Sequence, residues 1–251
     1  MATESLSPAE PRGRRVRAQA RFEAEILVRN GEQILVALVL PVLALLALVA
    51  SPYPELPAPR INLVAPGVLA LAVVSTAFTG QAIQTGFDRR YGVLRLLATS
   101  PVGTDGLLAG KALAVAGVVV GQLLVLGLIA AVAGWRPDPL GLLVTPVSAA
   151  LGVWVFVALA LLLAGVLRAE AVLAVANLVW VLLAGAGGLL LPGDTVGGLD
   201  AVVRWLPSGA LGDAFRDGLT GAGIPLVPWV VLVVWGIVLS LAVVRTFRWR
   251  D

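Results

Sequence analysis

The chain has 251 residues, of which 59% are hydrophobic and 13% charged, with a formal net charge of +3 and a mean hydropathy of +0.97. A soluble domain carries about a quarter charged residues, so this composition is that of an integral membrane protein. The chain lacks cysteine and histidine, which excludes disulfides, thiol nucleophiles and the commonest metal ligands, and we expect no catalytic, cofactor or metal site on it.

The first 32 residues form a polar, arginine-rich tail ahead of the first long apolar run. That run lacks a small-residue cleavage site, which argues against a signal peptide. Within the tail, RFEAEILVRN at 21–30 predicts an amphipathic interfacial helix with Phe22, Ile26 and Leu27 on its apolar face. The residues expected on the opposite face are Glu23, Glu25 and Arg29. Because arginines are attracted to anionic lipid, we expect a membrane-lipid partner and no nucleic acid.

Six apolar runs follow, each near or above the roughly 20 residues that a spanning helix needs. They cover residues 33–50, 63–86, 107–134, 140–167, 171–191 and 226–244. Joints rich in proline and glycine, such as 51–59, 134–139 and 191–198, separate them. We therefore expect an all-α integral membrane protein with a tail and interfacial helix at 1–32, a six-span domain at 33–244 and a C-terminal tail at 245–251.

The distribution of basic residues predicts the orientation of these spans. With the N-terminus in the cytoplasm, fourteen of the 18 basic residues fall on the cytoplasmic side. They are Arg12, Arg14, Arg15, Arg17, Arg21, Arg29, Arg89, Arg90, Arg95, Lys111, Arg168, Arg245, Arg248 and Arg250. The four on the outside are Arg60, Arg136, Arg204 and Arg216. The positive-inside rule thus predicts a multi-pass protein with both termini in the cytoplasm.

One amphipathic segment, FDRRYGVLRLLATSP at 87–101, interrupts the apolar pattern on the predicted cytoplasmic side. Asp88 favours a helix start, and Pro101 disfavours helical geometry at the residue before it, so we expect one helix from Asp88 to Thr99. The residues on its apolar face are Tyr91, Val93, Leu94, Leu97 and Ala98. About a dozen residues cannot cross a bilayer, so the helix lies on the membrane surface or docks into another protein.

The longer stretch FDRRYGVLRLLATSPVGTDGLLAGKAL, 87–113, resembles the signature of the ABC-2 type permease family, the membrane subunits of ATP-driven exporters. The matching positions are Asp88, Arg89, Gly92, Leu94, Leu97, Ser100, Pro101, Gly110 and Lys111. The sequence departs from the pattern at Asp88 and Arg95, where many members carry glutamate. The layout is also similar, because the family has an interfacial helix, six spans and external re-entrant helices, which the segment 199–219 resembles.

The resemblance implies a drug-exporter-like permease subunit in a bacterial cell membrane that moves a hydrophobic or amphipathic substrate outward. It implies no enzymatic activity on this chain, because ATP and magnesium would bind to a separate ABC ATPase subunit. A second permease subunit, as a homodimer, is also implied. The residues of the coupling helix that would contact the ATPase are Asp88, Arg89, Arg90, Tyr91, Gly92, Leu94, Leu97, Ser100 and Pro101.

Three further patterns have simple explanations. GLLAGKA at 106–112 lacks the spacing and the hydroxyl of a phosphate-binding loop, so we expect Lys111 to be an anchor that reaches the membrane interface. The small residues Gly106, Gly110, Ala114, Gly117 and Gly121 are better explained by packing within the chain than by a dimer seam. Four polar residues in the spans are candidates for interhelical hydrogen bonds or a substrate path: Gln81, Gln84, Gln122 and Asn177.

Other function classes fit the sequence less well. An ion-coupled carrier usually has ionisable residues deep in its spans, and none is expected here. An intramembrane protease would need HExxH, GxSG or a pair of mid-span aspartates, and the sequence has none of these. An ATP-independent secondary carrier or a structural membrane protein remains the alternative to the exporter subunit.

Overall fold

A computed structural model describes residues 10–29, 31–53, 55–98, 103–193 and 200–246, and every regular element within them is a helix. The expected all-α membrane fold is therefore confirmed. Four helices are long and apolar enough to cross a bilayer, at Ile61–Arg90, Ala109–Val132, Pro139–Val166 and Leu226–Thr246. Two shorter apolar stretches, Ala37–Ala50 and Ala169–Gly185, occupy the positions of the first and fifth predicted spans.

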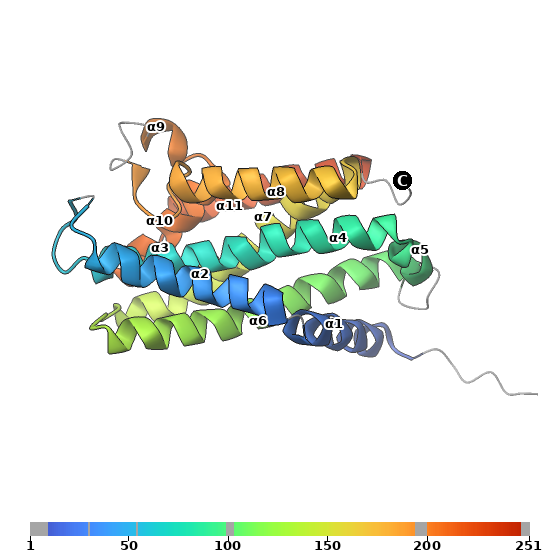
Figure 1. Ribbon diagram of the computed structural model, residues 1–251, viewed down its shortest axis with the longest axis horizontal. Coiled ribbons are helices and arrows are strands. Elements are labelled where there is room, and N and C mark those ends of the chain that lie inside the picture. Colours follow the sequence, from blue (N-terminus) through green and yellow to red (C-terminus); the bar gives the residue numbers. More distant parts are fainter. Residues whose placement is uncertain (1–9, 30, 54, 99–102, 194–199, 247–251) are drawn as a thin grey trace, which may run out of the picture.

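The long helices run side by side along the longest axis of the molecule (Figure 1). They are α2 (Gly31–Ala50), a continuous helix made of α3 (Ile61–Val74), a π-helical turn (Ser75–Gly80) and α4 (Gln81–Arg90), then α6 (Gly103–Val132), α7 (Pro139–Val166), α8 (Ala169–Gly185) and α11 (Leu226–Thr246). The N-terminal helix α1 (Arg12–Arg29) and the short α5 (Val93–Ala98) lie at one end of the bundle. We call this end the α5 end. The opposite end carries α9 (Asp200–Val203) and α10 (Pro207–Leu219).

The second predicted span is the centre of the bundle. In its most apolar window 83% of the residues are buried within the protein, against 28% for the windows of α6 and α11. The central helix packs against α2, α6, α7, α8 and α10. Its small side chains permit this close packing, and Gly67 approaches the backbone of Leu190 so closely that an added Cβ would collide with the carbonyl oxygen.

A proline in α2 accounts for one interhelical hydrogen bond inside the membrane. Pro41 has no N–H, so the carbonyl of Ala37, four residues earlier, lacks its helical partner. The amide Nε2 of Gln122 on α6 donates to that carbonyl at 3.0 Å, and its Oε1 accepts from Thr76 in the π-helical turn at 2.7 Å. The interhelical role expected for Gln122 is thus confirmed, whereas Asn177 is exposed rather than buried.

The segment 199–219, which the sequence predicts to be external, is held in its described part by a buried arginine. Arg216 on α10 donates to the carbonyls of Gly188 at 2.7 Å and Leu189 at 3.1 Å, and it pairs with Asp213 at 2.7 Å. Pro207 occupies the first turn of α10, where its missing N–H costs no hydrogen bond. Arg216, one of the four basic residues predicted to lie outside, thus joins α10 to the loop after α8.

Candidate functional site

The predicted helix from Asp88 to Thr99 is interrupted in the structure. The second span continues through Arg90 and ends there because Gly92 adopts a left-handed conformation with φ of 73°. Glycine is the usual residue at this position beyond a helix end, since a side chain would be strained. The single-helix prediction was therefore wrong, and Asp88 lies in the last turn of α4 rather than in the first turn of a new helix. Val93–Ala98 forms the separate helix α5, and Thr99, the predicted end of the helix, lies outside the described residues.

Lys111 connects three helices at the α5 end. Its Nζ lies 3.1 Å from Oε2 of Glu23 on α1 and 3.0 Å from Oδ2 of Asp88 on α4. The side chains of Lys111 and Glu23 are only 3% and 4% exposed. The expectation that Lys111 is an interfacial anchor was therefore wrong, because its ammonium points into the protein between two carboxylates. The carboxylate of Asp88 interacts unfavourably with the negative C-terminal end of the α4 dipole, and the ammonium of Lys111 offsets this unfavourable interaction.

Two arginines tie the end of α4 to the joint between α7 and α8. Arg89 is buried and donates from Nη2 to the carbonyl of Leu167 at 2.6 Å, just beyond the last turn of α7. Arg90 forms an ion pair with Glu170 in the first turn of α8. Asp88, Arg89 and Arg90 were predicted to contact a partner; the structure engages Asp88 and the buried Arg89 within the bundle, whereas Arg90 stays exposed in its pair with Glu170. The end of α4 is thus fixed to α1, α6, α7 and α8.

The N-terminal helix divides its predicted apolar face, because Leu27 packs on the bundle together with Glu23 from the predicted polar face. Glu23 and Leu27 are buried against the bundle, whereas Phe22 and Ile26 are 54% and 40% exposed. Gly110 on α6 permits this contact, because a Cβ there would lie 2.6 Å from Cγ of Gln19. The polar face can be buried because Lys111 neutralises Glu23, and the exposed apolar residues are suited to lipid. Gly110 thus serves packing within the chain, while Gly117 and Gly121 face open space.

The turn and α5 expose apolar side chains beyond this anchored base. Tyr91 and Leu96 are 71% and 77% exposed, and Val93 is 39% exposed. Leu94, which was predicted to contact a partner, is 2% exposed and packs inward. The side chain of Leu97 and the residues Ser100 and Pro101 lie outside the part that the structure describes. An exposed aromatic and aliphatic surface on a rigidly held base can receive a partner and transmit its displacement to several helices.

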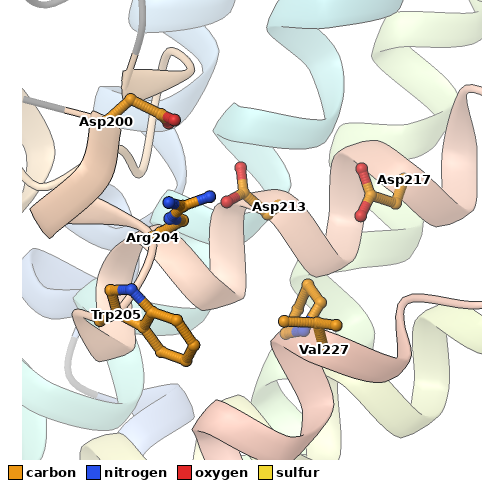
Figure 2. Close-up of a pocket in the computed structure, with 7 residues that line it drawn as sticks. Asp200, Arg204, Trp205, Asp213, Asp217 and Val227 are labelled. Carbon is orange, nitrogen blue, oxygen red and sulfur yellow. The ribbon is translucent and has the colours of Figure 1, made fainter. Parts of the chain in front are cut away.

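A second candidate is a pocket of about 300 Å³ at the opposite end, which α9, α10 and the start of α11 line. Arg204 lies between Asp200 and Asp213, with Trp205 below them and Asp217 farther along α10 (Figure 2). Burial raises the pKa of Asp217 above its usual value, Asp213 raises it further, and Arg216 partly offsets both effects. Asp213 is already paired with Arg216, and no group of three acidic side chains in the described ranges is arranged to hold a metal ion.

Comparison with known proteins gives a match that covers the α5 segment, the central span and the other apolar helices. Residues 34–245 match the family described as ABC-2 family transporter protein. The chain belongs to the ABC-2 transporter family. The resemblance found in the segment 87–113 is thereby confirmed over most of the chain. A search of curated proteins returned no significant match.

The matched range of this ABC-2 transporter protein contains almost all of α2 and every later apolar helix, but it excludes α1. It includes Asp88, Lys111 and Glu170 but not Glu23. Three residues of the site escaped the sequence analysis: Glu23 as a buried ion-pair partner, Glu170 as the partner of Arg90, and Leu96 as an exposed side chain. Helical periodicity alone could not identify the Lys111–Glu23 and Arg90–Glu170 ion pairs, because their members are 88 and 80 residues apart in the sequence.

Proposed function

We propose that this chain is the permease subunit of an ABC exporter and that a separate ABC ATPase docks on the turn and α5. The observation that carries the proposal is the combination of an exposed apolar surface with a fixed base. Tyr91 and Leu96 project from the turn and α5, while Asp88 and Arg90 are ion-paired to α6 and α8. A push on the exposed residues would therefore reach the spans instead of bending a loose loop.

The charge distribution supports the orientation that this function requires. The described basic residues of the predicted cytoplasmic set lie on α1, at the end of α4, on α5, on the first turns of α6, before α8 and at the end of α11. All of these positions are at the α5 end (Figure 1). Their concentration at one end is the pattern of a cytoplasmic face. The ATPase would then meet the α5 end in the cytoplasm of a bacterial cell, with ATP and magnesium bound on its own chain.

The arrangement of the spans supports a pathway between subunits rather than within one. The central helix is covered by protein on its sides. In contrast, α6 and α11 expose apolar faces, and Gly117 and Gly121 on α6 face open space. A homodimer that encloses such faces would offer a hydrophobic or amphipathic substrate a path lined by apolar side chains.

Affinity purification in a mild detergent, combined with crosslinking, tests the proposal. The chain has no cysteine, so single cysteines can be introduced at Tyr91, Leu96 and, as a matched buried control, Leu94. We expect a stoichiometric ABC ATPase to copurify and to crosslink through positions 91 and 96 but not 94. Purification without an ATPase, together with transport that depends on the proton gradient, would support the alternative secondary carrier and refute the exporter subunit.

A further inference from the structure

Helix α1 presents three distinct faces around its axis. At about 100° per residue, Gln19, Glu23 and Leu27 form the face that is buried against the bundle. The opposite face carries a basic stripe, which consists of Arg14, Arg17, Arg21 and Arg29, all exposed. Between these two faces lies an apolar edge formed by Phe22 and Ile26. The helix is therefore amphipathic on the side that the protein leaves uncovered.

The charge of the basic stripe is only partly balanced by the protein. Arg14 pairs with Glu10 and Arg21 with Glu25, but both are exposed pairs four residues apart, which bind weakly. Glu23, the other acidic residue of α1, points to the opposite side and is engaged by Lys111. Within the part of the chain that the structure describes, Arg17 and Arg29 form no ion pair. The stripe therefore presents a net positive surface.

The position of the stripe indicates the chemistry of its partner. Helix α1 ends at Arg29, and the apolar helix α2 begins at Gly31, so α1 must lie at the membrane boundary. In Figure 1, α1 is strongly foreshortened, so its axis is oblique to the spans. Phe22 and Ile26 flank the arginines, and a soluble polyanion would leave both in water. An anionic bilayer surface satisfies both features, since acyl chains accept the apolar edge and phosphates accept the arginines.

We propose that α1 is a binding helix for anionic phospholipid, with the basic stripe on the headgroup phosphates and the apolar edge in the acyl region. A hollow of about 290 Å³, lined by Arg21, Ala24, Glu25 and Arg29, provides space for a headgroup on the stripe. The buried face of the same helix holds Glu23 against Lys111, which also holds Asp88. Bound lipid therefore stabilises the docked position of α1 and, through these ion pairs, the end of α4.

The lipid contact can be tested on the purified chain without any ATPase. The variant Phe22→Cys would carry an environment-sensitive fluorophore in neutral detergent, and the probe would be phosphatidylglycerol or phosphatidylcholine added in mixed micelles. We expect a saturable blue shift with phosphatidylglycerol that high salt weakens, and no saturable response to phosphatidylcholine. Because this readout needs no ATP hydrolysis, its failure would be distinguishable from failure of the proposed export function.

Two double variants that remove the same charge at different ends of the molecule test whether phosphatidylglycerol binds to the basic stripe. Arg17→Gln with Arg29→Gln should raise the midpoint phosphatidylglycerol concentration about 30-fold, at about 1 kcal/mol per arginine and 1.4 kcal/mol per tenfold change. Arg136→Gln with Arg204→Gln removes the same charge at the opposite end and should leave the midpoint unchanged. Equal responses to both lipids, or equal midpoints in both variants, would overturn the proposal. A saturable shift with a DNA duplex and none with phosphatidylglycerol would overturn it in favour of nucleic acid.

Discussion

The Nζ of Lys111 on α6 lies 3.0 Å from Oδ2 of Asp88 on α4. This ion pair joins the C-terminal end of α4 to the N-terminal part of α6, on either side of the segment that forms α5. The two helices that flank α5 are thus joined where they leave the bundle. A force applied to α5 acts on both helices together, because the ion pair prevents them from separating independently. Glu23 extends this connection to α1, so one lysine couples three helices to the segment that we propose receives the ATPase.

Replacement of Lys111 by methionine should strongly destabilise the protein. The substitution leaves the carboxylates of Glu23 and Asp88 without their cation, and breaking a buried charge pair costs roughly 3–5 kcal/mol. Thermal unfolding in detergent, followed by near-UV circular dichroism, would measure the loss. The triple variant Lys111→Met, Glu23→Gln, Asp88→Asn removes all three charges and should recover most of the stability. A triple variant as unstable as the single one would contradict the ion-pair explanation.

Substitution of Leu96 by aspartate should weaken ATPase association without affecting folding. Leu96 is exposed, so its replacement removes apolar contact area from a partner and leaves the bundle intact. Tyr91→Ala should act in the same direction. Copurification of the ATPase measures the first effect and the melting temperature the second. Leu94→Asp is the matched control, since it buries a charge and should lower the melting temperature. Undiminished copurification with Leu96→Asp would count against docking at α5.

Gln122 and Pro41 should show energetic coupling in a double-mutant cycle. Gln122→Leu leaves the Ala37 carbonyl without a donor, and we expect a loss of about 0.6–2 kcal/mol, the range for interhelical hydrogen bonds in membranes. Pro41→Ala restores an N–H that can bond to Ala37 within α2. Gln122→Leu should therefore cost less in the Pro41→Ala background. Unfolding equilibria in mixed micelles would measure the four corners of the cycle, and strictly additive effects would rule out the shared carbonyl.

Asp217 should make stability depend on pH at the α10 end. Its pKa is raised above the reference value of 3.8 in the folded protein, so folding favours the protonated form. This contribution is fully present below pH 3.8 and is lost as the pH rises through the higher folded pKa. Relative to Asp217→Asn, the wild type should become less stable as the pH increases through that window. Melting temperatures of both proteins across pH 3 to 8 would measure the difference, and parallel curves would show that Asp217 makes no such contribution.

The sequence by itself determined the helical class, the order of the apolar helices and the presence of a polar segment between the second and third. These features are local, because length, hydropathy, prolines and the residues of 87–113 define them without reference to distant positions. For Gln122 it left two alternatives, an interhelical hydrogen bond or a substrate path, and the structure shows the hydrogen bonds.

Only the tertiary structure decided which side chains face inward. It buried Leu94 and exposed Leu96, turned the Glu23 face of α1 toward the bundle and made Lys111 an internal ion-pair partner. In a membrane an apolar side chain is stable against either lipid or protein, so hydrophobicity does not separate the inside of the bundle from its outside. A charged side chain can be buried only where opposite charges or hydrogen-bonding groups meet it, and the meeting of Glu23, Asp88 and Lys111 depends on how α1, α4 and α6 pack.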